Sequence, residues 1–221
     1  MRTILFSIFL LPAVLFAQEK APEQQPARFP FTLKTAPLNL INPFQFSVDV
    51  MSDIPVATNW SIEMGVGLVL DSKVFAQYKG DTYRGIKLKP TVKHYFSRTA
   101  DSDDYFGLAL KYNYLQEKHY FRVSRQGEQY WENQLTRRHI HTWGAAFRFG
   151  TQQYVGAHKR FIIEPFGALG IRQSFVSFND LPPDAAVVEG SGWFAGSRVA
   201  GIYTTPDFML GISMGWRLTS R

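Results

Sequence analysis

Two histidines that lie two positions apart, His139 and His141, are the closest match in the sequence to a ligand-binding pair. On a β-strand they would share one face, because successive side chains of a strand point to opposite sides. So placed, they can bind a metal ion or contact a charged lipid headgroup. A band of aromatic and cationic residues at a membrane surface has the same composition, and we favour that interpretation. We therefore predict no metal site and no cofactor, and we treat both histidines as candidate headgroup contacts.

Four arginines near the same segment extend this set of candidate contacts. They are Arg122, Arg125, Arg137 and Arg138, and they flank a predicted loop that also carries several aromatic residues. The planar guanidinium group of arginine suits bidentate contacts to phosphate. Loops of this composition are also common on solvated surfaces, and we favour that plainer interpretation for the arginines.

Features of covalent catalysis are lacking in the sequence, and we predict no catalytic residue. A serine nucleophile needs a positioned base, and no His-x-Ser arrangement or nucleophile elbow occurs. The chain contains no cysteine, which excludes thiol chemistry, disulfides and cysteine-ligated zinc. Its 24 basic and 18 acidic residues give a net charge of +6, but the charges are interleaved with apolar residues rather than gathered in runs. That pattern argues against a nucleic-acid partner.

Strands with strictly alternating side chains must position these residues. The stretch GIKLKPTVKHYF at residues 85–96 places isoleucine, leucine and valine on one face and three lysines on the other. Segments of this kind are predicted at residues 38–51, 60–70, 85–96, 105–121, 135–150, 161–178, 193–203 and 208–218. Such a series predicts an all-β fold, an antiparallel up-and-down β-barrel of eight strands, with nine or ten as alternatives.

Glycine placement indicates which face of these strands points inward. Glycines such as Gly65 and Gly67 fall on the polar face, where they would weaken a solvated strand without benefit. In a narrow lumen, small residues make room for long charged side chains. Aromatic residues such as Trp60 and Phe208 stand at ends of apolar faces, where interfacial girdles form. We therefore predict a transmembrane barrel, with a secreted soluble barrel around an apolar ligand as the alternative.

This orientation puts a network of charged side chains into the lumen. Its predicted members are Asp49, Glu63, Lys87, Lys89, Lys93, Lys111, Arg148, Glu164, Arg172, Arg198 and Arg217. An isolated charge there would cost on the order of several kcal/mol, so the charges must be paired or hydrated. We expect a plugged lumen, because eight strands leave room only for side chains, and an anion-attracting pore is the alternative. Glu63 is expected beside Lys87 or Lys89, and Arg217 beside Asp49.

Two details conflict with a regular barrel of these strands. Pro90 and Pro165 fall in the middle of predicted strands, where each removes a ladder hydrogen bond, and we expect a bulge or bend there. The long connections would also face the periplasm, against the usual arrangement. An additional strand within residues 29–41 would invert them.

The N-terminus has the pattern of a secretory signal. Arg2 precedes an apolar run over residues 4–16, which is too short to span a bilayer. We assign residues 1–17 to a signal peptide, residues 18–37 to a flexible lead-in and residues 38–221 to the barrel. This assignment predicts a barrel that is exported to the cell envelope.

The segments WSIEMGVGLVL, RGIKLKPTVKHYF and FMLGISMGWRL resemble strands of the small outer-membrane β-barrel proteins of Gram-negative bacteria. The likeness is to the OmpA-barrel and outer-membrane protein X type and covers residues 38–218. It implies a monomer in the cell outer membrane, with lipid, lipopolysaccharide and the outer-membrane assembly machinery as partners. It also implies a structural, adhesive or membrane-maintenance role. A lipid-modifying enzyme that uses His141 is the third hypothesis.

Overall fold

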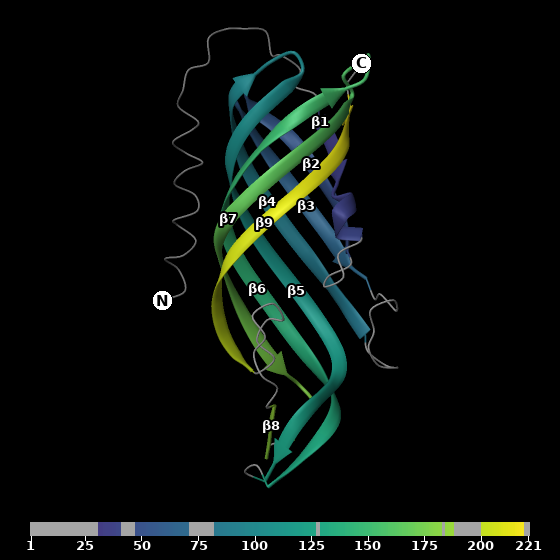
Figure 1. Cartoon of the computed structure of the whole chain (residues 1–221), viewed down its shortest axis with the longest axis vertical. Helices are drawn as coiled ribbons and strands as arrows, with labels where there is room; N and C mark the ends of the chain where they lie inside the picture. Colours follow the sequence, from purple (N-terminus) through teal and green to yellow (C-terminus); the bar gives the residue numbers. More distant parts are fainter. Residues whose placement is uncertain are drawn as a thin grey trace.

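The ring of strands closes on itself. The computed structural model describes residues 31–40, 47–70, 82–126, 129–182, 184–187 and 200–218. Around the ring, β4, β3, β2, β1, β9, β7, β6 and β5 are antiparallel neighbours, and pairing of β4 with β5 completes the circle (Figure 1). Their bounds are β1 (Phe31–Thr35), β2 (Ser47–Ala57), β3 (Trp60–Val69), β4 (Thr82–Arg98), β5 (Ser102–Arg125), β6 (Tyr130–Val155), β7 (Phe161–Phe178) and β9 (Gly201–Leu218). The predicted all-β, up-and-down, eight-stranded architecture is confirmed.

Individual strand assignments need correction. The ring begins at β1, inside the range assigned to a flexible lead-in, and the predicted strand at residues 38–51 starts only at Ser47. A short 3-10 helix, η2 (Pro37–Leu40), lies between these strands. Among the described residues, the two strands predicted at 193–203 and 208–218 form a single strand, β9. This strand continues through Pro206, which lies outside the part of β9 that pairs with β1. Residues 193–199 lie outside the described residues.

β1 also settles which connections share an end of the ring. Phe31 pairs with Leu218, so the two ends of the ring's chain meet at one end, together with the short turns at residues 58–59, 99–101 and 156–160. We call this the turn end. The opposite end, the loop end, receives the longer connections from β3 to β4 and from β7 to β9. A strand does lie within residues 29–41, and it places these longer connections at the end of the ring opposite Phe31.

β5 and β6 are far longer than their neighbours and project beyond the ring at the loop end. They contain 24 and 26 residues. Pairing with β4 ends at Lys118 of β5, and pairing with β7 ends at Arg138 of β6. Near the tip, β8 (Ala185–Val187) adds to the β5 edge, and Val187 packs there against Phe121 and Val123 (Figure 1). Among the described residues, no helix is long and apolar enough to cross a bilayer.

The two mid-strand prolines are accommodated without a bulge. Around Pro90, the β4–β5 ladder omits two pairs and resumes in the same register; around Pro165, the β6–β7 ladder does the same. The other neighbour of each proline stays paired, with Met64 opposite Pro90 and Ile212 opposite Pro165. Of the predicted bulge or bend, the bulge is therefore wrong at both positions. Register shifts occur instead next to two turns, between Pro55 and Ala57 and between Tyr95 and Ser97.

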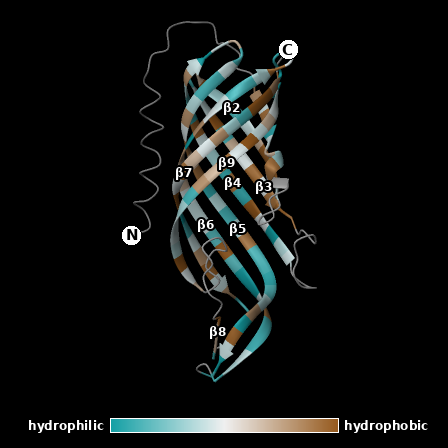
Figure 2. Ribbon diagram, viewed as in Figure 1, coloured by the Kyte–Doolittle hydropathy of each residue, from teal (hydrophilic) through white to brown (hydrophobic). Residues whose placement is uncertain are grey.

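The strands present apolar side chains outward and polar side chains inward, visible as alternating colours along each ribbon in Figure 2. One outward row crosses seven strands in continuous register: Ile54, Ile62, Val92, Leu108, Phe147, Leu169 and Phe208. Phe147 and Phe208 are 72 % and 74 % exposed, although both belong to regular strands. Inside the ring, a Cβ atom on Gly67 would lie 2.4 Å from Asp49 Oδ1, and one on Gly215 would lie 2.3 Å from Lys34 Cγ. Glycine at these positions gives charged side chains the room they occupy.

Candidate functional site

Six charged side chains meet inside the ring, and we call them the interior charge cluster. They are Lys34, Asp53, Glu63, Lys93, Arg148 and Glu164, three cations and three carboxylates. Lys34 Nζ donates to Asp53 Oδ2 at 2.9 Å, to Glu63 Oε2 at 2.5 Å and to Glu164 Oε2 at 2.6 Å. Three positive and three negative charges leave the cluster, in the interior of the ring, with no net formal charge.

Lys93 and Arg148 complete the same network from the opposite wall. Lys93 Nζ donates to Glu63 Oε2 at 2.6 Å and to Glu164 Oε1 at 2.9 Å. The Arg148 guanidinium reaches the same two carboxylates, at 2.5 Å from Glu63 Oε1 and 2.7 Å from Glu164 Oε1. Each glutamate thus accepts hydrogen bonds from all three cations. Shared partners of this kind couple the six residues, so none of the ion pairs is independent of the others.

Neutral side chains extend the cluster across the ring. The Tyr105 hydroxyl donates to Glu164 Oε1 at 2.6 Å, and Gln152 Nε2 donates to Asp53 Oδ2 at 2.9 Å. The cluster and these two residues come from seven of the eight ring strands, all but β9. All six charged residues are at most 5 % exposed. A buried charge is tolerated only when it is paired and hydrogen-bonded, and that condition is met here, with Asp53 Oδ1 the one cluster carboxylate oxygen that lacks a partner.

The carboxylates of the cluster have the spacing of a metal site but not its free ligands. Oxygen atoms of Asp53, Glu63 and Glu164 lie within 4.8 Å of one another. The same oxygens accept from Lys34, Lys93 and Arg148, which already neutralise them. A cation would have to displace three ammonium or guanidinium groups, so the arrangement is an ion-pair network.

A second charged layer lies nearer the loop end. Lys89 Nζ donates to Asp49 Oδ2 at 2.8 Å, and Lys111 is paired with Asp207. Lys87 Nζ donates to Ser47 Oγ at 2.9 Å, and the Ser47 hydroxyl donates in turn to Asp49. Lys87 is therefore linked to Asp49 through the hydroxyl of Ser47.

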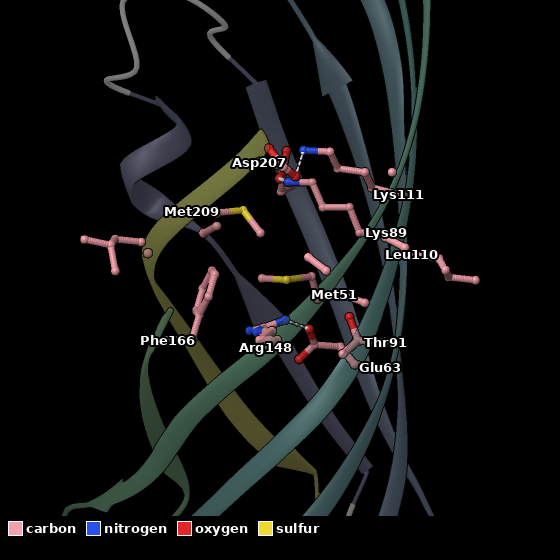
Figure 3. A pocket seen from close by; sticks show the side chains of 18 of the residues that line it. Met51, Glu63, Lys89, Thr91, Leu110, Lys111, Arg148, Phe166, Asp207 and Met209 are labelled. Atoms are coloured by element: carbon pink, nitrogen blue, oxygen red, sulfur yellow. Dashed lines mark hydrogen bonds and ion pairs between the residues drawn. The ribbon is translucent and has the colours of Figure 1, made fainter. Parts of the chain in front are cut away.

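A small cavity separates the two charged layers. It encloses about 70 Å³, and Met51, Phe166 and Met209 supply much of its apolar lining. Figure 3 shows the Lys111–Asp207 pair above these side chains and the Arg148–Glu63 pair below them. Arg148 also lies over the Phe166 ring, 3.8 Å from its centroid. Polar contacts thus close the interior on both sides of a short apolar section.

Several members of this interior were missed in the sequence. Lys34 lies in β1, which was considered only as an additional strand beyond the eight predicted ones, and Asp53 lies just past the predicted end of its strand. Asp207 falls in the gap left between two predicted segments. Asp53 could have been found by continuing the period of two from Asp49, because Asp49, Met51 and Asp53 share one face, although Met51 and Ser52 interrupt the polar and apolar pattern.

Two predicted contacts are wrong. Glu63 is opposite Thr91 in the β3–β4 ladder, and it contacts Lys34, Lys93 and Arg148 instead of Lys87 or Lys89. Arg217 does not meet Asp49, because β1 separates β9 from β2. Its guanidinium carbon lies 4.0 Å from the centroid of the Tyr154 ring.

Of the two other predicted lumen arginines, one does not join the network and the other is not described. Arg172 is exposed near the loop end, where its Nε donates to Thr205 Oγ1 at 3.0 Å. Arg198 lies outside the described residues. With Asp53 and Asp207 added and Arg172 exposed, the described part of the network is more acidic than the alternation alone indicates.

The candidate headgroup contacts divide between the two faces of the β5–β6 hairpin. Arg138 continues the interior face, is buried, and its Nε donates to Glu117 Oε2 at 2.7 Å, so it cannot contact a headgroup. Arg125 lies on the same face and pairs with Asp184 at 3.2 Å. The prediction of headgroup contact is corrected for these two arginines, because strand alternation turns them away from the outer face.

The other four candidates lie on the outer face. Arg122 stacks over the Trp131 ring, with 4.7 Å between the guanidinium carbon and the ring centroid, and Arg137 lies 3.5 Å from Asp180. His139 and His141 share their face, as expected of an alternating strand, and each contacts a tyrosine hydroxyl through Nδ1: His139 with Tyr114 at 2.9 Å and His141 with Tyr112 at 3.0 Å. The histidines therefore belong to an outward aromatic group.

Comparison with protein-family models, with curated proteins and with solved structures finds no match to this chain. Two geometric features of the described residues bear on function. One is a closed ring with a charged, buried interior. The other is an apolar outer surface that ends, toward the loop end, in aromatic and cationic side chains.

Proposed function

We propose that the protein is an outer-membrane β-barrel of a Gram-negative cell, of the general kind represented by the OmpA barrel and outer-membrane protein X. Its proposed role is structural, adhesive or membrane-maintaining, with an interior closed by ion pairs. One observation carries the proposal: all eight ring strands direct large apolar side chains outward, while the ring's interior buries charged ones. Lipid is the solvent that makes this inversion favourable.

The extent of the apolar surface supports lipid rather than water outside. Soluble monomers rarely expose contiguous apolar patches larger than a few hundred Å². Here the outward row from Ile54 to Phe208 spans seven strands without interruption, and Leu210 is 89 % exposed. β3, with ten residues, also has the length that a tilted strand needs to span the hydrocarbon layer.

The interior disfavours the second hypothesis, a secreted carrier of an apolar ligand. Such a carrier would line its interior with apolar side chains and leave charges on the outside. The interior charge cluster occupies the middle of this ring instead, and the free space beside it is only about 70 Å³. The same crowding favours a plugged lumen over an ion-conducting one.

The third hypothesis, a lipid-modifying enzyme, gains no specific support. His141, on which it depends, faces outward and contacts Tyr112. A general base needs a nucleophile within hydrogen-bonding reach. The contact that the structure gives to His141 Nδ1 is the hydroxyl of Tyr112, not that of a serine or threonine.

Fractionation of cells that express the full chain tests the proposal. We expect the protein in the outer-membrane fraction, extracted only by detergent, and we expect unheated samples to migrate differently from boiled ones on a denaturing gel. Recovery in the soluble periplasmic fraction, with no heat-dependent change in migration, would refute the membrane assignment and revive the soluble carrier.

A further inference from the structure

A hollow lies on the outer face near the loop end, where three strands run side by side. It measures about 450 Å³ and is lined by Thr82, Tyr83, Arg84, Gln116, Lys118 and Arg137. The strand registers place these residues on adjacent rungs: Arg84 is opposite Gln116, Thr82 is opposite Lys118, and Lys118 is opposite Arg137. Three cationic side chains from β4, β5 and β6 therefore converge on one surface depression.

The described residues around this hollow do not cancel its charge. Among the described residues, Arg84 and Lys118 have no carboxylate within ion-pair distance, and Arg137 has one, Asp180, at 3.5 Å. Three cations against one carboxylate leave two positive charges. Glu117, which lies between Gln116 and Lys118 in the chain, points to the opposite face and pairs with Arg138.

One of the cations is already oriented. Arg84 Nε donates to Gln116 Oε1 at 2.7 Å, across the β4–β5 ladder. This bond uses one edge of the guanidinium group and leaves its terminal nitrogens available to a ligand. Arginine held in this way loses less rotamer freedom on binding an oxyanion than a free surface side chain does.

The hollow directly adjoins the apolar outer surface. One step toward the turn end, Ile86, Tyr114 and His141 share a rung, and the next rung carries Leu88, Tyr112 and Trp143. At a rise of about 3.4 Å per residue, these rungs lie roughly 7–14 Å along the strands from the hollow. Tyrosine and tryptophan favour the boundary between hydrocarbon and headgroups, so the cations stand at headgroup depth.

We propose that this hollow binds the phosphate group of a membrane lipid headgroup in the leaflet at the loop end, with the lipid's acyl chains lying on the adjoining apolar rungs. The inference rests on the proposed outer-membrane location. Arg84 and Arg137 bind phosphate oxygens through planar nitrogen pairs, and Lys118 adds a point charge between them. A phosphorylated lipid satisfies the cations and the apolar surface together, whereas free phosphate satisfies only the cations.

Lipid titration of the full chain, folded in dodecyl maltoside micelles and followed by native mass spectrometry, tests this proposal. The probes are a bisphosphorylated diglucosamine lipid, the same lipid with its phosphates removed, and inorganic phosphate. The variants are Arg84→Gln and Lys118→Gln, with Lys118→Arg to preserve the charge. Lys159→Gln, at an exposed cation of the turn end that pairs with Asp101, is the matched control for loss of one charge.

We expect the phosphorylated lipid to bind at least tenfold more tightly than its dephosphorylated form. Arg84→Gln and Lys118→Gln should each weaken binding by about tenfold, the effect of losing one hydrogen bond between charged groups. Lys118→Arg and Lys159→Gln should bind as the unaltered protein does. Inorganic phosphate at the concentration of the lipid should not displace it.

Three results would overturn the proposal. In the first, Arg84→Gln and Lys118→Gln bind the lipid as tightly as the unaltered chain. In the second, Lys159→Gln weakens binding equally, which would indicate nonspecific attraction. In the third, inorganic phosphate competes on equal terms, which would make the hollow a site for free phosphate. A protein that fractionates with the outer membrane but fails these tests loses only this inference, whereas a soluble protein loses the proposed function first.

Discussion

Removal of one cation from the interior charge cluster is the sharpest test of how this interior is built. In Lys34→Met, a side chain of similar length loses its ammonium group, which contacts Asp53, Glu63 and Glu164. Three carboxylates then face two cations, Lys93 and Arg148, so one negative charge is left buried without compensation. Methionine is flexible enough to occupy the space of the lysine stem, so cavity formation contributes little.

The expected magnitude follows from burial. Lys34 is 2 % exposed, and removing one partner of a buried ion pair costs about 3–5 kcal/mol in the free energy of unfolding. The exposed pair of Lys159 and Asp101 serves as the comparison, because screening by solvent limits such a pair to about 0–1 kcal/mol. Lys34→Met should therefore destabilise the protein several times more than Lys159→Met does.

The double variant Lys34→Met/Glu164→Gln separates charge balance from packing. It leaves two carboxylates, Asp53 and Glu63, with the two remaining cations. Since the buried charge is again neutral overall, the double variant should be clearly less destabilised than the sum of the two single variants, by more than about 1 kcal/mol. Reversible urea unfolding in lipid vesicles, followed by tryptophan fluorescence, measures the stabilities of the unaltered protein, the two single variants, the double variant and Lys159→Met.

Two outcomes would refute this reasoning. If Lys34→Met costs no more than Lys159→Met, the interior ammonium group does not contribute to stability as a buried charge should. If the effects of Lys34→Met and Glu164→Gln simply add, the two residues do not form a coupled pair, and the account of a balanced cluster is wrong.

Three further predictions concern the outer surface, the glycines and the lumen. Phe208→Arg, on the outward row, should reduce stability in vesicles by about 2–4 kcal/mol, and an unchanged unfolding midpoint would argue against lipid contact at that position. Gly67→Val should lower the free energy of unfolding by about 1–3 kcal/mol, because a Cβ atom at this position would lie 2.4 Å from Asp49 Oδ1 and force it to move. No change in the urea titration would show that Asp49 has room to move. In planar bilayers, the unaltered protein should give no conductance steps, and stable steps of uniform size would end the plugged-lumen hypothesis.

The alternation of side chains was enough to predict most of the ring. The strands with long, regular alternations are β3 through β7. Each of them overlaps the range that was predicted for it. β1 was missed because FTLKT is only five residues long and offers too few alternations to distinguish it from a loop. β9 was predicted as two strands because Thr204, Thr205 and Pro206 interrupt its apolar pattern. In the structure, this part of β9 pairs with β7 and not with β1.

Side-chain alternation does not predict which charged residues pair with one another inside the ring. Alternation and register predict neighbours on adjacent strands, whereas several contacts of the interior charge cluster cross the ring. Lys93 on β4 reaches Glu164 on β7, three strands away around the ring. Such a contact depends on ring closure and on the length of the lysine stem, and neither can be obtained from one strand's sequence. The same limit explains why Glu63 was assigned to the wrong lysines.

Closure of the ring depends on its shortest strand, and the interior charge cluster explains how that strand is retained. β1 pairs with β9 over five residues and with β2 over four, a small number of backbone contacts for the seam between the two ends of the sheet. Lys34 is the single charged residue of β1, and its ammonium group ties the strand to β2, β3 and β7 at once. Gly215 of β9 leaves the space through which the lysine stem passes. The cluster therefore stabilises the seam as well as the lumen, because the three hydrogen bonds of Lys34 both pair buried charges and link β1 to other strands of the ring.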